Sequence, residues 1–274
     1  MATITVNGVR LAYDEAGAGP PVIWVHGSWT DRQGARLVAP LLAERYRVIT
    51  YDRRGHSQSE RVPGPQGVKA HVADLAGVID QLDARPAHLV TNSLGGEIAL
   101  KLALERPELV ASLCLHEPPL HGCLPHDPEI EQARSDMQAL EDEVIAELEH
   151  GDHEMAAQLF MEDLLGPGAW EAFPEPSRQT FIHNAPTWLD DVTDPTQGTL
   201  ELGQVTALTT PVLLTVGGRS HPVDVAVDVC LAATLPEPVR HTFTDAGHIP
   251  HLTHPDVYAA IVRSFLDDVV AKAT

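Results

Sequence analysis

The amino-acid sequence predicts an α/β fold with an eight-stranded, mostly parallel sheet and a helical segment inserted after the sixth strand. Eight short apolar runs, rich in β-branched residues, recur along the chain with turn signals between them. Helical patterns separate the later runs, as the crossovers between parallel strands require. At 274 residues, the chain is long enough for one such domain with an insertion, and its core needs no disulfide bonds.

The predicted sheet begins with a hairpin. Its first two strands, Thr3–Val6 and Val9–Tyr13, flank Asn7-Gly8, a dipeptide typical of tight hairpin turns, so the sheet should start antiparallel. The other six strands are predicted at Val22–Val25, Arg47–Tyr51, His88–Val90, Ala111–Leu115, Val212–Val216 and Val239–Phe243. Crossover helices are predicted over residues 74–82, 96–105 and 255–272, the last opening on a proline at its first position.

Residues 121–206 are predicted to form a helical cap domain, which leaves residues 1–120 and 207–274 as the core domain. An apolar stripe recurs there at three- and four-residue spacing: Met137, Leu140, Val144 and Leu148. Further helices are expected around residues 155–165 and 177–189. The segment also holds five aromatic residues, namely Phe160, Trp170, Phe173, Phe181 and Trp188. Most should pack the helices onto the core, and a helical insertion after a strand end favours a lid over a pocket.

The charge distribution excludes some classes of partner. The formal net charge is -21, and the insertion carries 19 of the 39 acidic residues with only two bases, Arg134 and Arg178. Nucleic-acid binding is disfavoured, because it needs a basic surface. The insertion is expected to present a solvated acidic face, which would also repel anionic substrates.

The cysteines and the N-terminal residues bear on location. The three cysteines are odd in number and form no CxxC pair, which favours reduced thiols. The start of the chain lacks a signal-peptide pattern, and no run of about 18 apolar residues occurs. We therefore expect a soluble, cytoplasmic protein with no membrane partner. Its oligomeric state is left open, with a homodimer among the alternatives.

The candidate nucleophile lies after the fifth predicted strand. There the strand runs into a helix through T-N-S-L-G-G, which places Ser93 at the turn. A sharp strand-to-helix turn strains the serine backbone and needs small residues two positions before and after it. Gly95 meets this need, whereas Thr91 should crowd the turn. Alone the motif is weak, because a serine that caps a helix would look the same.

Three further motifs follow predicted strands in the same way. H-G-S-W starts at His26, D-R-R-G-H-S starts at Asp52, and D-A-G-H ends at His248. With these four motifs in family order, the chain resembles the α/β-hydrolase superfamily over nearly its whole length.

The resemblance implies a role for individual residues. Ser93 would attack a carbonyl carbon, His248 would act as its general base, and an acyl-enzyme would then be hydrolysed without a cofactor. The backbone N–H groups of Ser28 and Leu94 would form the oxyanion hole. The resemblance gives structural roles to Asp52 and His56, and we expect the same of His26.

The acid of the triad departs from the common pattern. Many family members carry it after the seventh strand, but that segment reads G-G-R-S-H-P here, and Asp224 follows three residues too late. A minority of the superfamily, including lactone hydrolases of the zearalenone-degrading kind and certain cofactor-free dioxygenases, takes it from the end of the sixth strand. Glu117 stands at that position. We favour Glu117, with Asp224 as the alternative.

A histidine cluster near the C-terminus does not predict a metal site. His248, His251 and His254 lie three residues apart, but Pro250 and Pro255 interrupt any helix that would align them. No bound metal is expected, and His251 and His254 are interpreted as pocket-rim or helix-capping residues.

The expected reaction is hydrolysis of a small-molecule ester or lactone that is neutral and moderately apolar or aromatic. Trp29, Asn92 and Trp188 are the candidate pocket residues. A serine at the elbow disfavours epoxide hydrolase and dehalogenase chemistry, which use a carboxylate nucleophile in this fold. Two alternatives stay open: a C–C bond hydrolase of aromatic degradation, whose elbow the Asn92-Ser93 pair resembles, and a non-catalytic ligand-binding protein.

Overall fold

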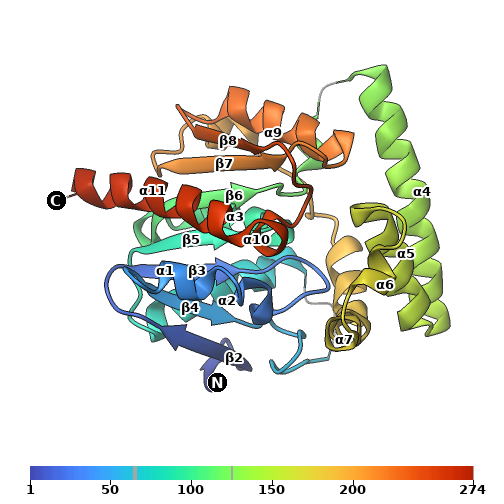
Figure 1. The fold of residues 1–274 in the computed structure, drawn as a ribbon, viewed down its shortest axis with the longest axis horizontal. Helices are drawn as coiled ribbons and strands as arrows, with labels where there is room; N and C mark the ends of the chain where they lie inside the picture. Colours follow the sequence, from blue (N-terminus) through green and yellow to red (C-terminus); the bar gives the residue numbers. More distant parts are fainter. Residues whose placement is uncertain (64–66, 125, 274) are drawn as a thin grey trace.

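The computed structural model describes residues 1–63, 67–124 and 126–273, and it has the predicted α/β architecture (Figure 1). The eight strands are β1 (Ala2–Val6), β2 (Val9–Ala16), β3 (Pro21–Val25), β4 (Arg47–Tyr51), β5 (Ala87–Thr91), β6 (Val110–His116), β7 (Val212–Gly217) and β8 (Val239–Phe243). They form one sheet in the order β1-β2-β4-β3-β5-β6-β7-β8. The first two pairings, β1 with β2 and β2 with β4, are antiparallel, and all others are parallel. The predicted hairpin and the mostly parallel sheet are therefore confirmed.

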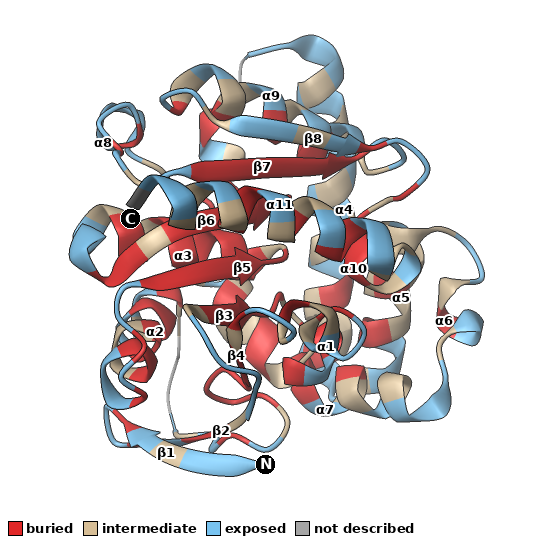
Figure 2. Cartoon of the chain, turned by 60° about the vertical axis from the view of Figure 1, so that its left-hand side comes forward, coloured by how far each residue is buried: buried red, intermediate tan, exposed pale blue. Residues whose placement is uncertain are grey.

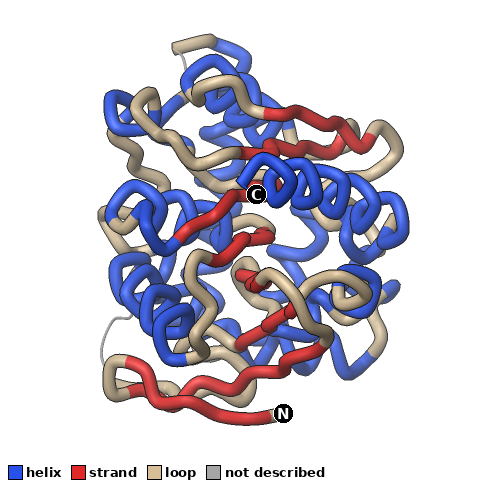
Figure 3. Tube along the Cα trace, turned by 90° about the vertical axis from the view of Figure 1, so that its left-hand side faces the viewer, coloured by secondary structure: helices blue, strands red, loops and turns tan. Residues whose placement is uncertain are grey.

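Helices cover both faces of the sheet, as the side view shows (Figure 3). One face packs against α2 (Val68–Gln81), α3 (Leu94–Glu105) and α9 (Pro222–Thr234). The other packs against α1 (Ala39–Leu42) and α11 (Pro255–Ala273), with α10 (Pro250–Thr253) just before it. The central strands are buried on both sides, whereas the edge strands β1 and β8 are largely exposed (Figure 2). Long apolar runs in the central strands follow from this double burial.

The chain between β6 and β7 is helical. It forms α4 (Pro128–His150), α5 (His153–Leu165), α6 (Ala169–Ala172), α7 (Glu175–Val192) and α8 (Leu202–Val205). The first four, which we call the helical insertion, lie together beyond one end of the strands (Figure 1). They share an apolar cluster of their own, into which Trp29 projects from the loop after β3. None of the helices in the described ranges combines the length and apolar character that a membrane crossing requires.

Candidate active site

The order of the strands brings the predicted site residues together. Strand β5 lies between β3 and β6 and runs parallel to both. The loops that follow these three strands therefore meet at the carboxyl ends of the central strands. A cavity at these ends is lined by all five residues of the predicted triad and oxyanion hole: Ser28, Ser93, Leu94, Glu117 and His248. Ligand sites of parallel α/β sheets lie outside these carboxyl ends of the strands.

Ser93 occupies a strained turn between β5 and α3. Its φ of 53° and ψ of -129° lie outside the regions that L-residues favour. A Cβ on Gly95 would stand 2.0 Å from the Val25 carbonyl oxygen, so this position requires glycine. Thr91, expected to crowd the turn, is buried and donates its hydroxyl to the Cys114 carbonyl at 2.9 Å. The threonine is thus accommodated by turning its polar atom into the sheet.

His248 is held from two sides. Its Nδ1 lies 2.5 Å from Oε2 of Glu117, and its backbone carbonyl accepts a hydrogen bond of 3.0 Å from the Asn92 side chain. Asn92 thereby ties the histidine loop to the residue next to Ser93. Burial alone would lower the pKa of His248, but the hydrogen bond and charge of Glu117, and then the charge of Asp224, raise it above its usual value.

Glu117 follows β6 with a φ of 47°, in the left-handed region. Its Oε1 accepts hydrogen bonds from the Gly217 backbone at 2.7 Å and from the Ser220 hydroxyl at 2.6 Å, while Oε2 faces His248. Burial opposes ionisation, but His116 and the hydrogen bonds from His248 and Ser220 outweigh it and lower the pKa of Glu117 to about 2. This carboxylate is therefore ionised at neutral pH and oriented by three donors.

Asp224 lies in the same cavity in a different environment. Its side chain is 7% exposed, and within the described residues it has no hydrogen-bond partner. Burial, together with the charges of Glu117 and Asp163, raises the pKa of Asp224 to about 7, against the attraction of His248. Ligand atoms of Glu117, Asp224 and His248 lie within 4.8 Å of one another, so these three could hold a metal ion.

The remaining wall of the cavity comes largely from the helical insertion. Phe160 and Trp188 supply aromatic surface, while Glu141, Asp163 and Asp191 add three carboxyl groups to those of Glu117 and Asp224. Among the described residues, no lysine or arginine lines the cavity. Burial raises the pKa of Glu141 and Asp163, as expected for carboxyl groups in an apolar, acidic space. The described part of the cavity wall therefore offers no lysine or arginine that could pair with a carboxylate.

Two predicted pocket residues lie elsewhere. Trp188 lines the cavity, but Trp29 is completely buried behind it, with its ring 5.1 Å from Phe160 and 5.3 Å from Trp188. Asn92 is buried and holds the histidine loop instead of facing the cavity. Both corrections have one cause: the residues next to the predicted oxyanion and nucleophile positions pack the protein interior around the cavity.

The two histidines after His248 differ from each other. His251, interpreted as a rim or capping residue, is buried in α10 with its ring 5.1 Å from that of Trp24, so the prediction is wrong. Burial lowers its pKa well below the usual value, which keeps it neutral. His254 joins α10 to α11, and its carbonyl accepts from the Tyr258 N–H at 2.9 Å in a capping position.

A cluster around Arg53 escaped the sequence analysis. The Arg53 side chain is fully buried and contacts Gly27, His56, His71 and Asp191. The sequence signal is the pair of adjacent arginines, Arg53 and Arg54, that follows β4. Asp52 has the structural role expected of it, accepting from the Arg32 and Gln58 backbones at 2.9 and 3.0 Å.

Comparisons with known proteins agree with this architecture. The sequence matches the family described as alpha/beta hydrolase fold over residues 20–255. A 2-hydroxymuconate semialdehyde hydrolase of Pseudomonas sp. (strain CF600) is 28% identical over 98% of this chain and 95% of its own length. An uncharacterised hydrolase of Bacillus subtilis (strain 168) is 32% identical over 59% of this chain, and the match spans only 51% of that protein. The structure of a thermophilic esterase from Thermogutta terrifontis matches with a TM-score of 0.80 and 25% identity, over 98% of both chains.

Proposed function

This chain belongs to the alpha/beta hydrolase fold family, and we propose that it is a serine hydrolase that cleaves a neutral carboxylic ester or lactone through an acyl-enzyme. The observation that carries the proposal is the hydrogen bond between His248 and Glu117 at the wall of the cavity that Ser93 also lines. A nucleophile, a base and an oriented carboxylate are the parts that acyl transfer requires.

In the proposed mechanism, Ser93 Oγ attacks the carbonyl carbon and its proton passes to Nε2 of His248. Glu117 holds the proton on Nδ1 and stabilises the imidazolium that forms. The imidazolium then protonates the leaving alkoxide as the bond to the acyl carbon breaks. Water, deprotonated by His248, hydrolyses the acyl-enzyme and regenerates Ser93.

The oxyanion that develops on the substrate is assigned to the N–H groups of Ser28 and Leu94. Leu94 is the first residue of α3, where N–H groups have no partner within the helix. Ser28 follows β3 and lines the same cavity. Each such donor is worth about 3 kcal/mol in the transition state.

Substrate charge follows from the cavity wall. Among the described residues, the wall offers carboxyl groups but no lysine or arginine to pair with an anionic acyl group, which is therefore disfavoured. Phe160 and Trp188 favour apolar or aromatic substituents. A neutral ester or lactone with such substituents fits both features.

The proposal is tested with 4-nitrophenyl acetate and a fluorophosphonate probe. The wild-type chain should release nitrophenol steadily and be labelled at Ser93, and Ser93→Ala should lose at least about 10³-fold in kcat together with the label. A folded wild-type chain that turns over no ester and resists the probe would instead be a ligand-binding member of the fold.

A second candidate, C–C bond hydrolysis, is favoured by the Pseudomonas relative, which the chain matches over nearly its full length. The compound in that relative's name carries a carboxylate, which the acidic cavity would repel. We therefore expect kcat for 4-nitrophenyl acetate to exceed kcat for 2-hydroxymuconate semialdehyde. Turnover of the semialdehyde is measured as the loss of its absorbance. The reverse ranking would favour the C–C hydrolase.

A further inference from the structure

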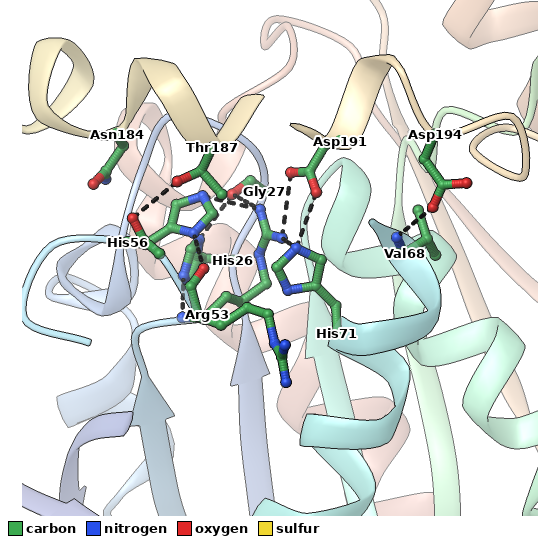
Figure 4. Close-up of polar contacts among 12 residues, drawn as sticks. His26, Gly27, Arg53, His56, Val68, His71, Asn184, Thr187, Asp191 and Asp194 are labelled. Atoms are coloured by element: carbon green, nitrogen blue, oxygen red, sulfur yellow. Dashed lines mark hydrogen bonds and ion pairs between the residues drawn. The ribbon is translucent and has the colours of Figure 1, made fainter. Parts of the chain in front are cut away.

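The peptide bond that joins Gly27 to Ser28 is fixed by two buried side chains that contact its carbonyl oxygen. The Gly27 carbonyl oxygen lies 2.8 Å from Nδ1 of His26 and accepts a hydrogen bond of 3.1 Å from Nη2 of Arg53 (Figure 4). A trans peptide is planar, so its N–H points away from its C=O. Two donors on the Gly27 carbonyl therefore fix the direction of the Ser28 N–H. In the described part of the chain, that N–H has no protein acceptor, and Ser28 lines the cavity.

The tautomer of His26 follows from its second nitrogen. Its Nε2 accepts the Arg53 backbone N–H at 2.9 Å. Burial and the charge of Arg53 lower the pKa of His26 well below its usual value, so the ring is neutral. A neutral ring with an accepting Nε2 carries its proton on Nδ1. His26 is therefore a donor to Gly27, and it acts together with the Arg53 guanidinium.

Arg53 is in turn held by the helical insertion. Asp191, on α7, places Oδ2 3.5 Å from Nη1 of Arg53 and Oδ1 2.9 Å from Nε2 of His71 (Figure 4). His71 Nε2 lies 2.9 Å from the same Nη1, and His56 Nε2 lies 3.2 Å from Nη2. Burial and then the charge of Arg53 lower the pKa of both histidines, which leaves Asp191 as the anionic partner. Since Arg53 is completely buried, this counter-charge is required.

We propose that Arg53 is a positioning residue that orients the Ser28 N–H of the oxyanion hole, and that Asp191 makes this orientation depend on the docking of α7. The inference rests on the proposed function. Its physical basis is that oxyanion donors act by being aimed before the reaction begins. A hydrogen bond to a peptide carbonyl also polarises the N–H of the same peptide and so strengthens it as a donor.

The test compares 4-nitrophenyl acetate with its thiono analogue, in which sulfur replaces the carbonyl oxygen. The sulfur that becomes negative in the transition state of the thiono ester is a weak hydrogen-bond acceptor. An oriented N–H therefore accelerates the oxygen ester more than the thiono ester. Arg53→Met should lower kcat for the oxygen ester by about 10²-fold, with KM within about 3-fold, and lower it far less for the thiono ester. The preference for oxygen over sulfur should therefore collapse.

Two variants guard against a failure to fold. Arg53→Lys keeps a positive charge beside Asp191, but a single ammonium group cannot replace the guanidinium that contacts both Asp191 and the Gly27 carbonyl. This variant should therefore also lose most of the preference for the oxygen ester. Thr187→Val is the matched control, because it removes two other contacts of α7 with the core. The Thr187 hydroxyl donates to the Gly55 carbonyl at 2.8 Å and accepts from Arg61 at 2.9 Å. The control should keep the preference within about 2-fold.

The outcomes are distinguishable. Equal losses on both esters in Arg53→Lys and Arg53→Met, or a preference unchanged from wild type, would overturn the positioning role while leaving the hydrolase in place. A wild-type chain that hydrolyses neither ester would instead overturn the proposed function.

Discussion

The end of β6 and the start of α9 each bring a carboxyl group close to His248, and the two groups differ in how they are held. Glu117 accepts hydrogen bonds from His248, Gly217 and Ser220, and its pKa is lowered to about 2. Asp224 is buried in the same cavity without such partners in the described chain, and its pKa is raised to about 7. Under the proposed function, this difference favours Glu117 over Asp224 as the triad acid, because a carboxyl group needs donors to stay ionised in a buried site.

Removing each of the two carboxyl groups in turn should have very different effects on turnover. Glu117→Ala should lower kcat for 4-nitrophenyl acetate by about 10³- to 10⁴-fold, because His248 loses the group that fixes its tautomer. Asp224→Ala should cost less than about 10-fold, since no hydrogen bond to His248 is lost. Circular dichroism should report folded protein for both. A larger loss in Asp224→Ala would return the role of the acid to the loop after β7.

A milder change tests the hydrogen bonds that hold Glu117. Ser220→Ala removes the 2.6 Å bond to Oε1 but leaves the Gly217 and His248 contacts in place. Hydrogen bonds to charged groups contribute about 1.5 to 3 kcal/mol, and we expect a part of this to appear as a loss of about 5- to 20-fold in kcat. Ser177→Ala, in the first turn of α7 away from the cavity, is the control. Wild-type kcat in Ser220→Ala would mean that the remaining donors suffice.

The sequence predicted most of the sheet, and the candidate site residues that local motifs mark line one cavity. Every predicted strand lies within three residues of its observed bounds, because buried strands have a distinctive apolar pattern. The first residues of helices are harder to predict from the sequence. Helix α2 begins at Val68, six residues before the predicted start, and there the Val68 N–H donates to Asp194 at 2.7 Å. A cap supplied by a side chain 126 residues away leaves no local signal.

The same reason explains what was missed around the site. Trp29 is a predicted pocket residue next to Ser28 in the sequence, but its ring packs inside the apolar cluster of the helical insertion. The contacts of Arg53 with His71 and Asp191 join three segments that only the tertiary fold brings together. Helix α9 was not predicted, although Pro222 at its first position is a start signal.

The smallest expected effect concerns the pKa of His248, which the charges of Glu117 and Asp224 both raise. Ionised Asp224 raises the pKa of His248, and the base works only when neutral, so kcat/KM should rise with pH as His248 loses its proton. Asp224→Asn removes that charge and should move the acid limb of the profile to lower pH by about half a unit to one unit. Because Asp224 itself titrates near pH 7, the wild-type limb reports the pair and should be broader than that of the variant. A limb that moves to higher pH in Asp224→Asn would mean that the carboxyl group is protonated throughout this range and donates to a partner at the site.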